Sequence, residues 1–147
     1  MTGRPVGTIG CVAARGIHHV GIAVADLDAA LLVYERLFGS SLEDRETLES
    51  QGVEAASLHT GTGRIELLRP LGPDTPVGRF IAKRGPGMHH VAFEVDDVAA
   101  ELARLRAEGA RLVDAEPRPG LFGLEVAFLH PEATGGVLAE FVRDDRD

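Results

Sequence analysis

Residues 17–24 read IHHVGIAV and residues 88–95 read MHHVAFEV, so the chain contains one short pattern twice. In both copies a histidine pair precedes an alternation of apolar and small residues, which is typical of a β-strand with one buried face. A pattern that recurs within one short chain indicates an internal duplication. These two stretches therefore organise the interpretation of the rest of the sequence.

An amphipathic helix is expected after each copy of the pattern. Asp26 and Asp97 stand where a side chain would cap the N-terminus of a helix. Beyond each of them apolar residues recur at steps of three and four. Gly39 and Gly109 follow, where a glycine commonly ends a helix. Each strand is thus predicted to lead into one helix of about three turns.

Short strands are predicted after each helix. The first three cover residues 43–48, 53–59 and 64–69, and the second three cover residues 111–115, 124–130 and 136–142. Each half of the chain therefore reads β-α-β-β-β. Two such modules would place their sheets side by side about a pseudo-twofold axis.

The predicted organisation is a single domain over residues 16–147, preceded by a flexible leader at residues 1–15. Module one covers residues 16–70 and module two covers residues 87–143. Residues 71–86 form the connector, which is rich in proline and glycine around a short helix near residues 77–84.

Strand alternation places His19 beside Gly21 on one face, and His90 beside Ala92 on the equivalent face. The small neighbours leave space in front of each histidine. The last strand of each module carries one acid among apolar residues, Glu66 and then Glu140. A carboxylate in such a place is costly unless it is paired, protonated or bound to a metal.

Two imidazoles and two carboxylates suit a divalent metal ion. We therefore predict one ion per chain, held by His19, Glu66, His90 and Glu140. The sequence leaves its identity open among Co, Mn, Ni, Fe, Zn and Mg. The same alternation predicts that His18 and His89 point to the opposite face as packing or supporting groups.

Composition excludes several classes of function. The chain has 147 residues, 15 Lys and Arg against 23 Asp and Glu, and a net charge of -8. Such a surface argues against nucleic acid and anionic membranes as partners, and no apolar run is long enough to span a bilayer. Cys11 is the single cysteine, which favours a reducing, cytoplasmic location over a disulfide-rich secreted one.

The sequence resembles the vicinal oxygen chelate (glyoxalase/bleomycin resistance) superfamily, and within it the methylmalonyl-CoA epimerase family. The resemblance extends over residues 16–143. The stretches that carry it are residues 19–28, 51–53, 65–71, 87–97, 116–120 and 128–138. It implies an α+β fold in which two tandem βαβββ modules form an open β-barrel-like metal cleft.

The resemblance also implies an activity. It assigns His19, Glu66, His90 and Glu140 as metal ligands, the same four residues that the repeat indicates. The implied reaction interconverts (R)- and (S)-methylmalonyl-CoA by α-proton abstraction through a metal-chelated enolate, with Glu140 as the first candidate for the base. A small acyl-CoA substrate and a homodimer are the implied partners.

Two departures from the family keep alternatives open. Ala55 stands where some epimerases carry a second Glu, which leaves Glu54 after a register shift, Glu66 or a metal-bound water as the second proton carrier. The bulky Leu121-Phe122 pair replaces a small loop near the substrate. Another metal-dependent enzyme, such as a glyoxalase I-type lyase (lactoylglutathione lyase) or a pathway-specific isomerase, is therefore the second interpretation. A metal-free ligand-binding or resistance protein is the third.

The phosphates of CoA would need a local basic patch on this acidic chain. Four cations are available for it, three in the connector and one in the following module: Arg79, Lys83, Arg84 and Arg118. The sequence does not distinguish this role from ordinary surface charge.

Overall fold

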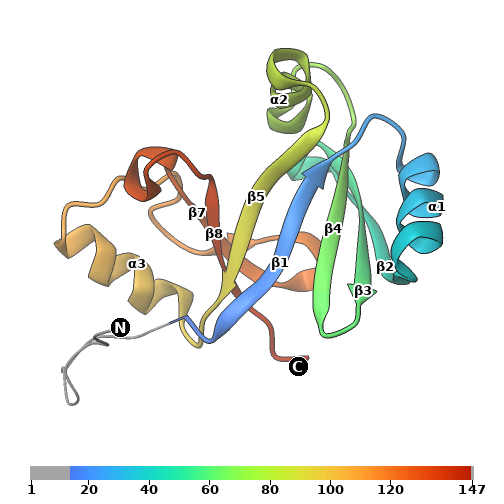
Figure 1. The fold of residues 1–147 in the computed structure, drawn as a ribbon. Coiled ribbons are helices and arrows are strands. Elements are labelled where there is room, and N and C mark those ends of the chain that lie inside the picture. Colours follow the sequence, from blue (N-terminus) through green and yellow to red (C-terminus); the bar gives the residue numbers. More distant parts are fainter. Residues whose placement is uncertain (1–13, 147) are drawn as a thin grey trace.

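The computed structural model describes residues 14–146, which form one eight-stranded sheet with three helices (Figure 1). The first half contains β1 (Gly16–Ala23), α1 (Leu27–Phe38), β2 (Ser41–Leu48), η1 (Glu49–Gln51), β3 (Val53–Thr60) and β4 (Gly63–Pro70). After α2 (Pro76–Arg84), the second half contains β5 (Gly87–Glu94), α3 (Val98–Ala107), β6 (Arg118–Pro119), η2 (Leu121–Gly123), β7 (Glu125–Leu129), η3 (Pro131–Thr134) and β8 (Ala139–Arg143). The predicted leader lies outside the described residues except for its last two positions.

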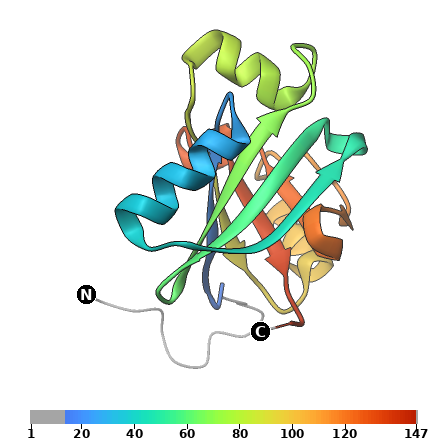
Figure 2. The same cartoon turned by 90° about the vertical axis from the view of Figure 1, so that its right-hand side faces the viewer.

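The strands follow the order β2-β3-β4-β1-β5-β8-β7-β6. In each half the first strand pairs in parallel with the last one, β1 with β4 and β5 with β8. The two halves join through the antiparallel pairing of β1 with β5. The sheet curls into a half-barrel (Figure 2), and the predicted glyoxalase-like fold of two βαβββ modules is confirmed.

Both module helices begin at the predicted capping residues. The Asp26 carboxylate accepts a hydrogen bond from the backbone N–H of Ala29, and the Asp97 carboxylate accepts one from Ala100. Gly39 ends α1 in the left-handed conformation, with φ of 67°. These side-chain acceptors satisfy helix N–H groups that have no partner within the helix.

Each module helix covers the outer face of its own half of the sheet. In α1 the side chains of Leu27, Leu31 and Tyr34 pack against alternate residues of β1, β3 and β4. In α3, Val98 and Leu102 pack in the same way on β7 and β8. Because alternate strand residues point to opposite faces, this packing leaves the inner, concave face of the sheet for a site.

The prediction of a strand over residues 111–115 is wrong. Only an isolated bridge joins Leu112 to Leu129, and β6 is the two-residue segment Arg118–Pro119. The Asp114 carboxylate accepts hydrogen bonds from the backbone N–H of Phe128 and from Arg118. The backbone N–H groups of Val113 and Asp114 also both donate to the carbonyl of Phe128. A turn and a side chain thus replace the regular ladder that a longer strand would have supplied.

Within residues 14–146, none of the helices has the length and apolar character needed to cross a bilayer.

Candidate metal centre

The pairing of β1 with β5 aligns the predicted site residues in two rows. On one side of the pair Val20–Val91, His19 lies opposite Ala92, and Ala92 lies beside Glu140 of β8. These three residues form the first row. The second row lies on the other side of Val20–Val91, where Gly21 is the small residue equivalent to Ala92. It consists of His90, Gly21 and Glu66. Each row therefore combines the histidine of one module with the glutamate of the other module.

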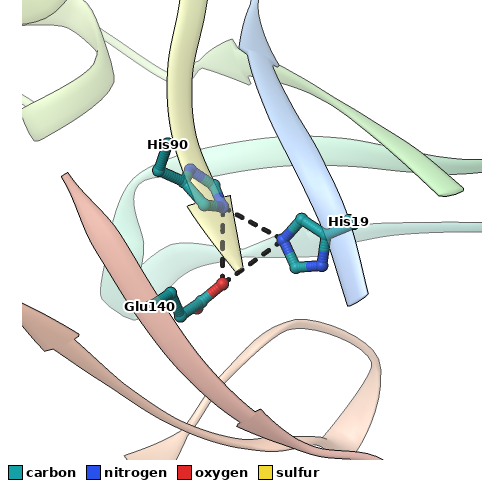
Figure 3. Close-up of side chains that lie close together, drawn as sticks. All are labelled: His19, His90 and Glu140. Carbon is teal, nitrogen blue, oxygen red and sulfur yellow. Dashed lines mark hydrogen bonds and ion pairs between the residues drawn. The ribbon is translucent and has the colours of Figure 1, made fainter. Parts of the chain in front are cut away.

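The three side chains of His19, His90 and Glu140 converge on the concave face (Figure 3). The Nε2 atoms of the two imidazoles are 3.0 Å apart. Glu140 Oε1 lies 3.3 Å from His19 Nε2 and 3.4 Å from His90 Nε2. Glu66 Oε2 lies 3.5 Å from His19 Nε2. The structure thus brings together all four residues that the sequence indicated, and each is at most 6% exposed.

The donor set fits a divalent cation. Ligand atoms bound at about 2.1 Å to one ion are about 3.0–3.4 Å apart in octahedral or tetrahedral geometry, which matches the separations among the His19, His90 and Glu140 atoms. The buried Glu140 Oε1 has no hydrogen-bond partner among residues 14–146. An unpaired buried carboxylate oxygen is costly, so the arrangement favours a bound ion.

The carboxylates and imidazoles shift one another's proton affinity. Burial on its own lowers the pKa of His19, but the negative charges of Glu66 and Glu140 outweigh it and raise that pKa above the usual value. Burial raises the pKa of Glu140, whereas the adjacent imidazoles of His19 and His90 bring it well below the usual range. Glu140 is therefore ionised at neutral pH, as a metal ligand or proton acceptor must be.

A β-bulge at the same position of each module corrects the prediction for the neighbouring histidines. The register between β1 and β5 slips at His18 and again at His89. Because a bulge re-aims side chains, His18 Nδ1 lies 2.8 Å from His19 Nδ1, and His89 Nδ1 lies 2.9 Å from His90 Nδ1. The prediction that His18 and His89 point to the opposite face is wrong; both contact the site histidines directly.

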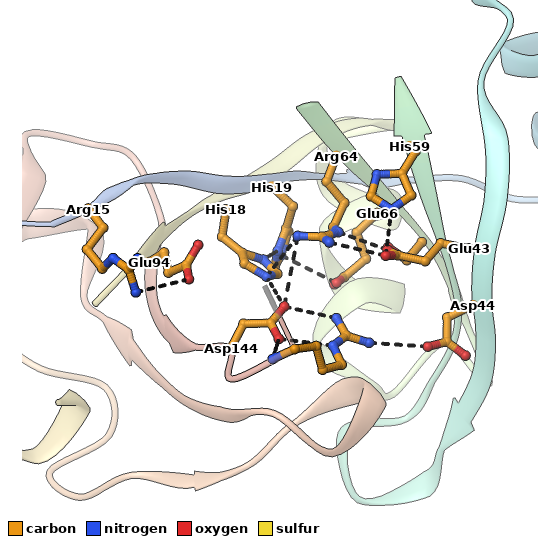
Figure 4. Close-up of polar contacts among 12 residues, drawn as sticks. Arg15, His18, His19, Glu43, Asp44, His59, Arg64, Glu66, Glu94 and Asp144 are labelled. Carbon is orange, nitrogen blue, oxygen red and sulfur yellow. Dashed lines mark hydrogen bonds and ion pairs between the residues drawn. The ribbon is translucent and has the colours of Figure 1, made fainter. Parts of the chain in front are cut away.

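Asp144 influences which nitrogen of His19 carries the hydrogen, and it does so through His18 (Figure 4). Its Oδ2 lies 2.7 Å from His18 Nε2, and the donor-only Arg64 Nη1 lies farther from the same nitrogen, at 3.1 Å. Because an ionised carboxylate only accepts hydrogen bonds, the shorter contact with Asp144 favours a hydrogen on His18 Nε2. With a hydrogen on His18 Nε2, His18 Nδ1 is the acceptor, and His19 Nδ1 donates to it. His19 Nε2 consequently presents a lone pair to the cluster, which is the tautomer that a metal needs.

Asp144 is itself held by cations. Burial raises the pKa of Asp144, but hydrogen bonds from Arg146 and His18 keep it well below the usual range. Arg64 Nη1 lies 3.9 Å from Asp144 Oδ2, and the same guanidinium donates to both oxygens of Glu43. Sequence reasoning missed Asp144, because nothing in the local pattern links it to a strand at the other end of the chain.

A pocket of about 220 Å³ opens over the cluster. Polar groups at its base include His19, His90 and Glu140, whereas its far wall is apolar. In that wall Leu121 lines the pocket with Val53, Leu68 and Val77. Ala55 belongs to the same buried cluster but is not among the residues that line the pocket. The bulky Leu121 is thus part of the apolar wall, and Ala55 lies in the buried cluster that includes this wall.

Glu54 is directed away from this pocket. It accepts hydrogen bonds from Arg45 and Arg69, and those bonds lower its pKa. The register of β3 against β4 is regular from Val53 to Thr60, with Ala55 opposite Leu68. The register shift that would have turned Glu54 into the site is therefore absent.

The loop that carries Leu121 is fixed to the other module. Glu46 Oε2 accepts a hydrogen bond from the backbone N–H of Phe122, which has a φ of 61°. A left-handed conformation is uncommon for a residue other than glycine, and it is associated with functional sites. The contact joins β2 of module one to the wall of the pocket.

The chain consists of two βαβββ modules, and their shared concave sheet carries a His-Glu-His-Glu set. It therefore belongs to the class of paired-module proteins with a candidate site for one divalent ion. The profile of the Glyoxalase/Bleomycin resistance protein/Dioxygenase superfamily matches residues 18–128. The chain belongs to this superfamily, and its close relatives are methylmalonyl-CoA epimerases.

The similarity covers most of the chain. The mitochondrial methylmalonyl-CoA epimerase of Homo sapiens is 38% identical over 125 residues, which is 84% of this chain and 71% of the relative. The ethylmalonyl-CoA/methylmalonyl-CoA epimerase of Cereibacter sphaeroides is 37% identical, over 84% of this chain and 94% of the relative. A Streptomyces coelicolor methylmalonyl-CoA epimerase variant, solved with 2-nitronate-propionyl-CoA, superposes with a TM-score of 0.86 at 39% identity. That comparison covers 90% of this chain and 99% of the other.

Gly21 makes the room that the His90 imidazole occupies. A Cβ atom added at Gly21 would lie 2.2 Å from His90 Cε1, so the ring would have to move. We expect Gly21→Ala to weaken divalent-metal binding about 10- to 100-fold, as measured by calorimetric titration with Co²⁺. Gly16→Ala is the matched control in β1, because nothing lies within 4 Å of its added Cβ. Equal metal affinity in the two variants would show that His90 tolerates the displacement.

Asp144→Asn tests the tautomer argument. An amide can donate to His18 Nε2, which would reverse the hydrogen-bond direction and turn a hydrogen of His19 toward the cluster. We expect the affinity for Co²⁺ to fall about tenfold or more, with the circular dichroism spectrum unchanged. Asp145→Asn is the control, since Asp145 is exposed and pairs only with Arg143 among the described residues. An unchanged affinity in Asp144→Asn would contradict this role of Asp144.

Proposed function

We propose that this chain is a metal-dependent epimerase that interconverts the (R) and (S) forms of methylmalonyl-CoA or a close 2-alkylmalonyl-CoA. The observation that carries the proposal is the convergence of His19, His90 and Glu140 at the base of one pocket. The epimerase relatives described above supply the substrate class.

The metal would be held by His19, Glu66, His90 and Glu140. When bound, a divalent ion supplies a Lewis acid for the negative charge that develops on the thioester and carboxylate oxygens as the α-proton leaves. The residues themselves exclude water from the base of the pocket, since all four are buried. A low-dielectric surrounding strengthens every charge interaction made there.

Glu140 is the proposed base. It is ionised at neutral pH because His19 and His90 lower its pKa, and its Oε1 has no hydrogen-bond partner among the described residues. Proton transfer to a positioned carboxylate contributes roughly 10²- to 10⁴-fold to a rate. Glu66, on the equivalent row of the other module, is the remaining carboxylate of the cluster that could serve the opposite face of the substrate.

Gln51 is a further group available to the substrate. It lines the pocket, and its buried Nε2 has no hydrogen-bond partner within residues 14–146. An amide N–H in this position suits a substrate oxygen. The apolar wall of Val53, Leu68 and Leu121 then accepts the 2-alkyl substituent, which supports a substituent of methyl size or larger.

A cytoplasmic homodimer is the assembly that we propose. Among the exposed apolar side chains of α1, Val33 and Leu37 are four residues apart and share one face of the helix, and exposed apolar surface marks association sites. β2 and β6 end the sheet, and an unpaired edge strand also favours association. The single Cys11 agrees with a reducing compartment.

Light scattering coupled to size-exclusion chromatography tests the dimer. We expect a mass of twice 15.6 kDa, the mass of one chain. A measured mass equal to that of one chain would contradict the dimer.

Exchange of the α-proton in deuterated water tests the activity. Protein loaded with Co²⁺ should incorporate deuterium into methylmalonyl-CoA, and protein stripped by a chelator should not. We expect Glu140→Gln to reduce the exchange rate by at least about 100-fold, as followed by NMR. Starting separately from the (R) and (S) forms shows which proton Glu140 removes.

Glu132→Gln is the matched control for this experiment. Glu132 lies in η3, is exposed, and pairs with Arg111 at the surface, so its exchange rate should equal that of the parent protein. The metal content of each sample is measured in parallel, so that loss of metal and loss of the base are separated. Absence of exchange from fully metallated parent protein would overturn the epimerase proposal, and hemithioacetal substrates of glyoxalase I-type lyases would be assayed next.

A further inference from the structure

A second groove, of about 590 Å³, lies beside the pocket between α2, β5 and the segment that leads into β8. No aspartate or glutamate is among the residues that line it. Three of its lining side chains are the cations Arg79, Lys83 and Arg84 of α2. In a chain with a net charge of -8, this groove is a local region of opposite sign.

These three cations differ from most others of the protein. Among residues 14–146, nearly all remaining arginines form an ion pair with a carboxylate, as Arg118 does with Asp114. The lysines and arginines for which no such pair occurs within the described residues are Arg36, Arg79, Lys83, Arg84 and Arg106. Three of these five therefore gather on one nine-residue helix and line one groove.

The packing of α2 fixes the direction in which its cations point. Val77, Phe80 and Ile81 pack onto the apolar cluster below the helix. Arg79 and Lys83 are four residues apart and so share one face of the helix. Arg84 lies over the Phe80 ring at 5.9 Å, and Arg79 Nη1 donates to the carbonyl of Asp74. These contacts orient two of the guanidinium groups without neutralising them.

The groove adjoins the pocket over the metal cluster. His89, His90 and Leu138 line both cavities. The ring of Phe80 packs edge-on against His89 at 5.0 Å, so α2 touches the wall that the two cavities share. A long ligand with its reactive end at Glu140 can therefore place its other end beside the cations of α2.

We propose that Arg79, Lys83 and Arg84 bind the phosphate groups of the CoA portion of the substrate, with the pantetheine arm passing His89. The inference rests on the proposed function, because it takes an acyl-CoA as the substrate. A diphosphate and a phosphomonoester need several cations at one end of an elongated ligand, and this groove supplies three. Arg118 has no part in this contact, since it is paired with Asp114 and packs over Phe128.

The test compares the variant Arg79→Gln/Lys83→Gln/Arg84→Gln with the parent protein on two thioesters. For methylmalonyl-CoA we expect KM to rise about 10- to 100-fold, with kcat within about twofold, since exposed charge-assisted contacts affect binding and not the α-proton. For methylmalonyl-pantetheine, which lacks the phosphates, both constants should be unchanged. Added salt should raise KM for methylmalonyl-CoA in the parent and much less in the variant.

Arg36→Gln is the matched control. Arg36 is exposed on α1 and has no ion pair among the described residues, so its loss changes net charge without touching the groove. An unchanged KM for methylmalonyl-CoA in the triple variant would overturn the proposal, as would an equal rise for both thioesters. An equal rise in Arg36→Gln would assign the effect to net charge and overturn it as well.

Calorimetric titration with free CoA and with pantetheine separates this proposal from the proposed function. If the parent protein binds CoA and the triple variant binds it at least tenfold more weakly, the groove is a CoA-phosphate site even if no epimerisation is found. If the parent protein epimerises methylmalonyl-CoA but binds CoA and pantetheine equally, the activity stands and the groove proposal fails. Adenosine 3′,5′-bisphosphate as a competitor shows whether the phosphates alone are recognised.

Discussion

The antiparallel pairing of β1 with β5 is the interaction on which the rest of this structure depends. Val20 faces Val91 at its centre, and on either side a histidine faces a small residue. Because β4 and β8 run parallel to these strands, each histidine shares a row with the glutamate of the other module. Neither module alone contains a complete row. The site is therefore a property of the interface between the two halves, and a slip of one residue would turn the ligands to the outer face.

The electrostatics follow from burial at this interface. Burying two carboxylates and two imidazoles costs free energy unless opposite charges or an ion compensate. In this protein, a chain of hydrogen bonds from Asp144 through His18 to His19 contributes to that compensation. Asp144 supports His18, and His18 supports His19, while hydrogen bonds from Arg146 and His18 keep Asp144 ionised. Opposite these polar groups, the wall of the pocket that contains Leu121 is apolar. A substrate with a charged reactive end and an alkyl branch matches that division.

The sequence allowed the modules, the helix caps and the four converging residues to be predicted, because each depends on a local pattern that occurs twice. Three features could not be predicted in this way. The bulges at His18 and His89 arise from the pairing of two strands that are far apart in the chain. The orientation of Glu54 depends on Arg45 and Arg69 from neighbouring strands. Likewise, only the tertiary structure distinguishes Arg118, which has an acidic partner, from the cations of α2, which line a groove.

The two modules also give the site a particular position along the chain. Along the chain, His19 lies in the first described strand, β1, and Glu140 lies in the last, β8. During synthesis the first histidine is therefore made long before the carboxylate that completes its row, and a chain that stops before β8 has an incomplete site. An ion bound there would join the first strand to the last and close the longest loop in the fold, where a cross-link restricts the unfolded chain most. Occupancy of the site would thus report that the whole chain has been made and folded, and would protect both ends of the domain from fraying.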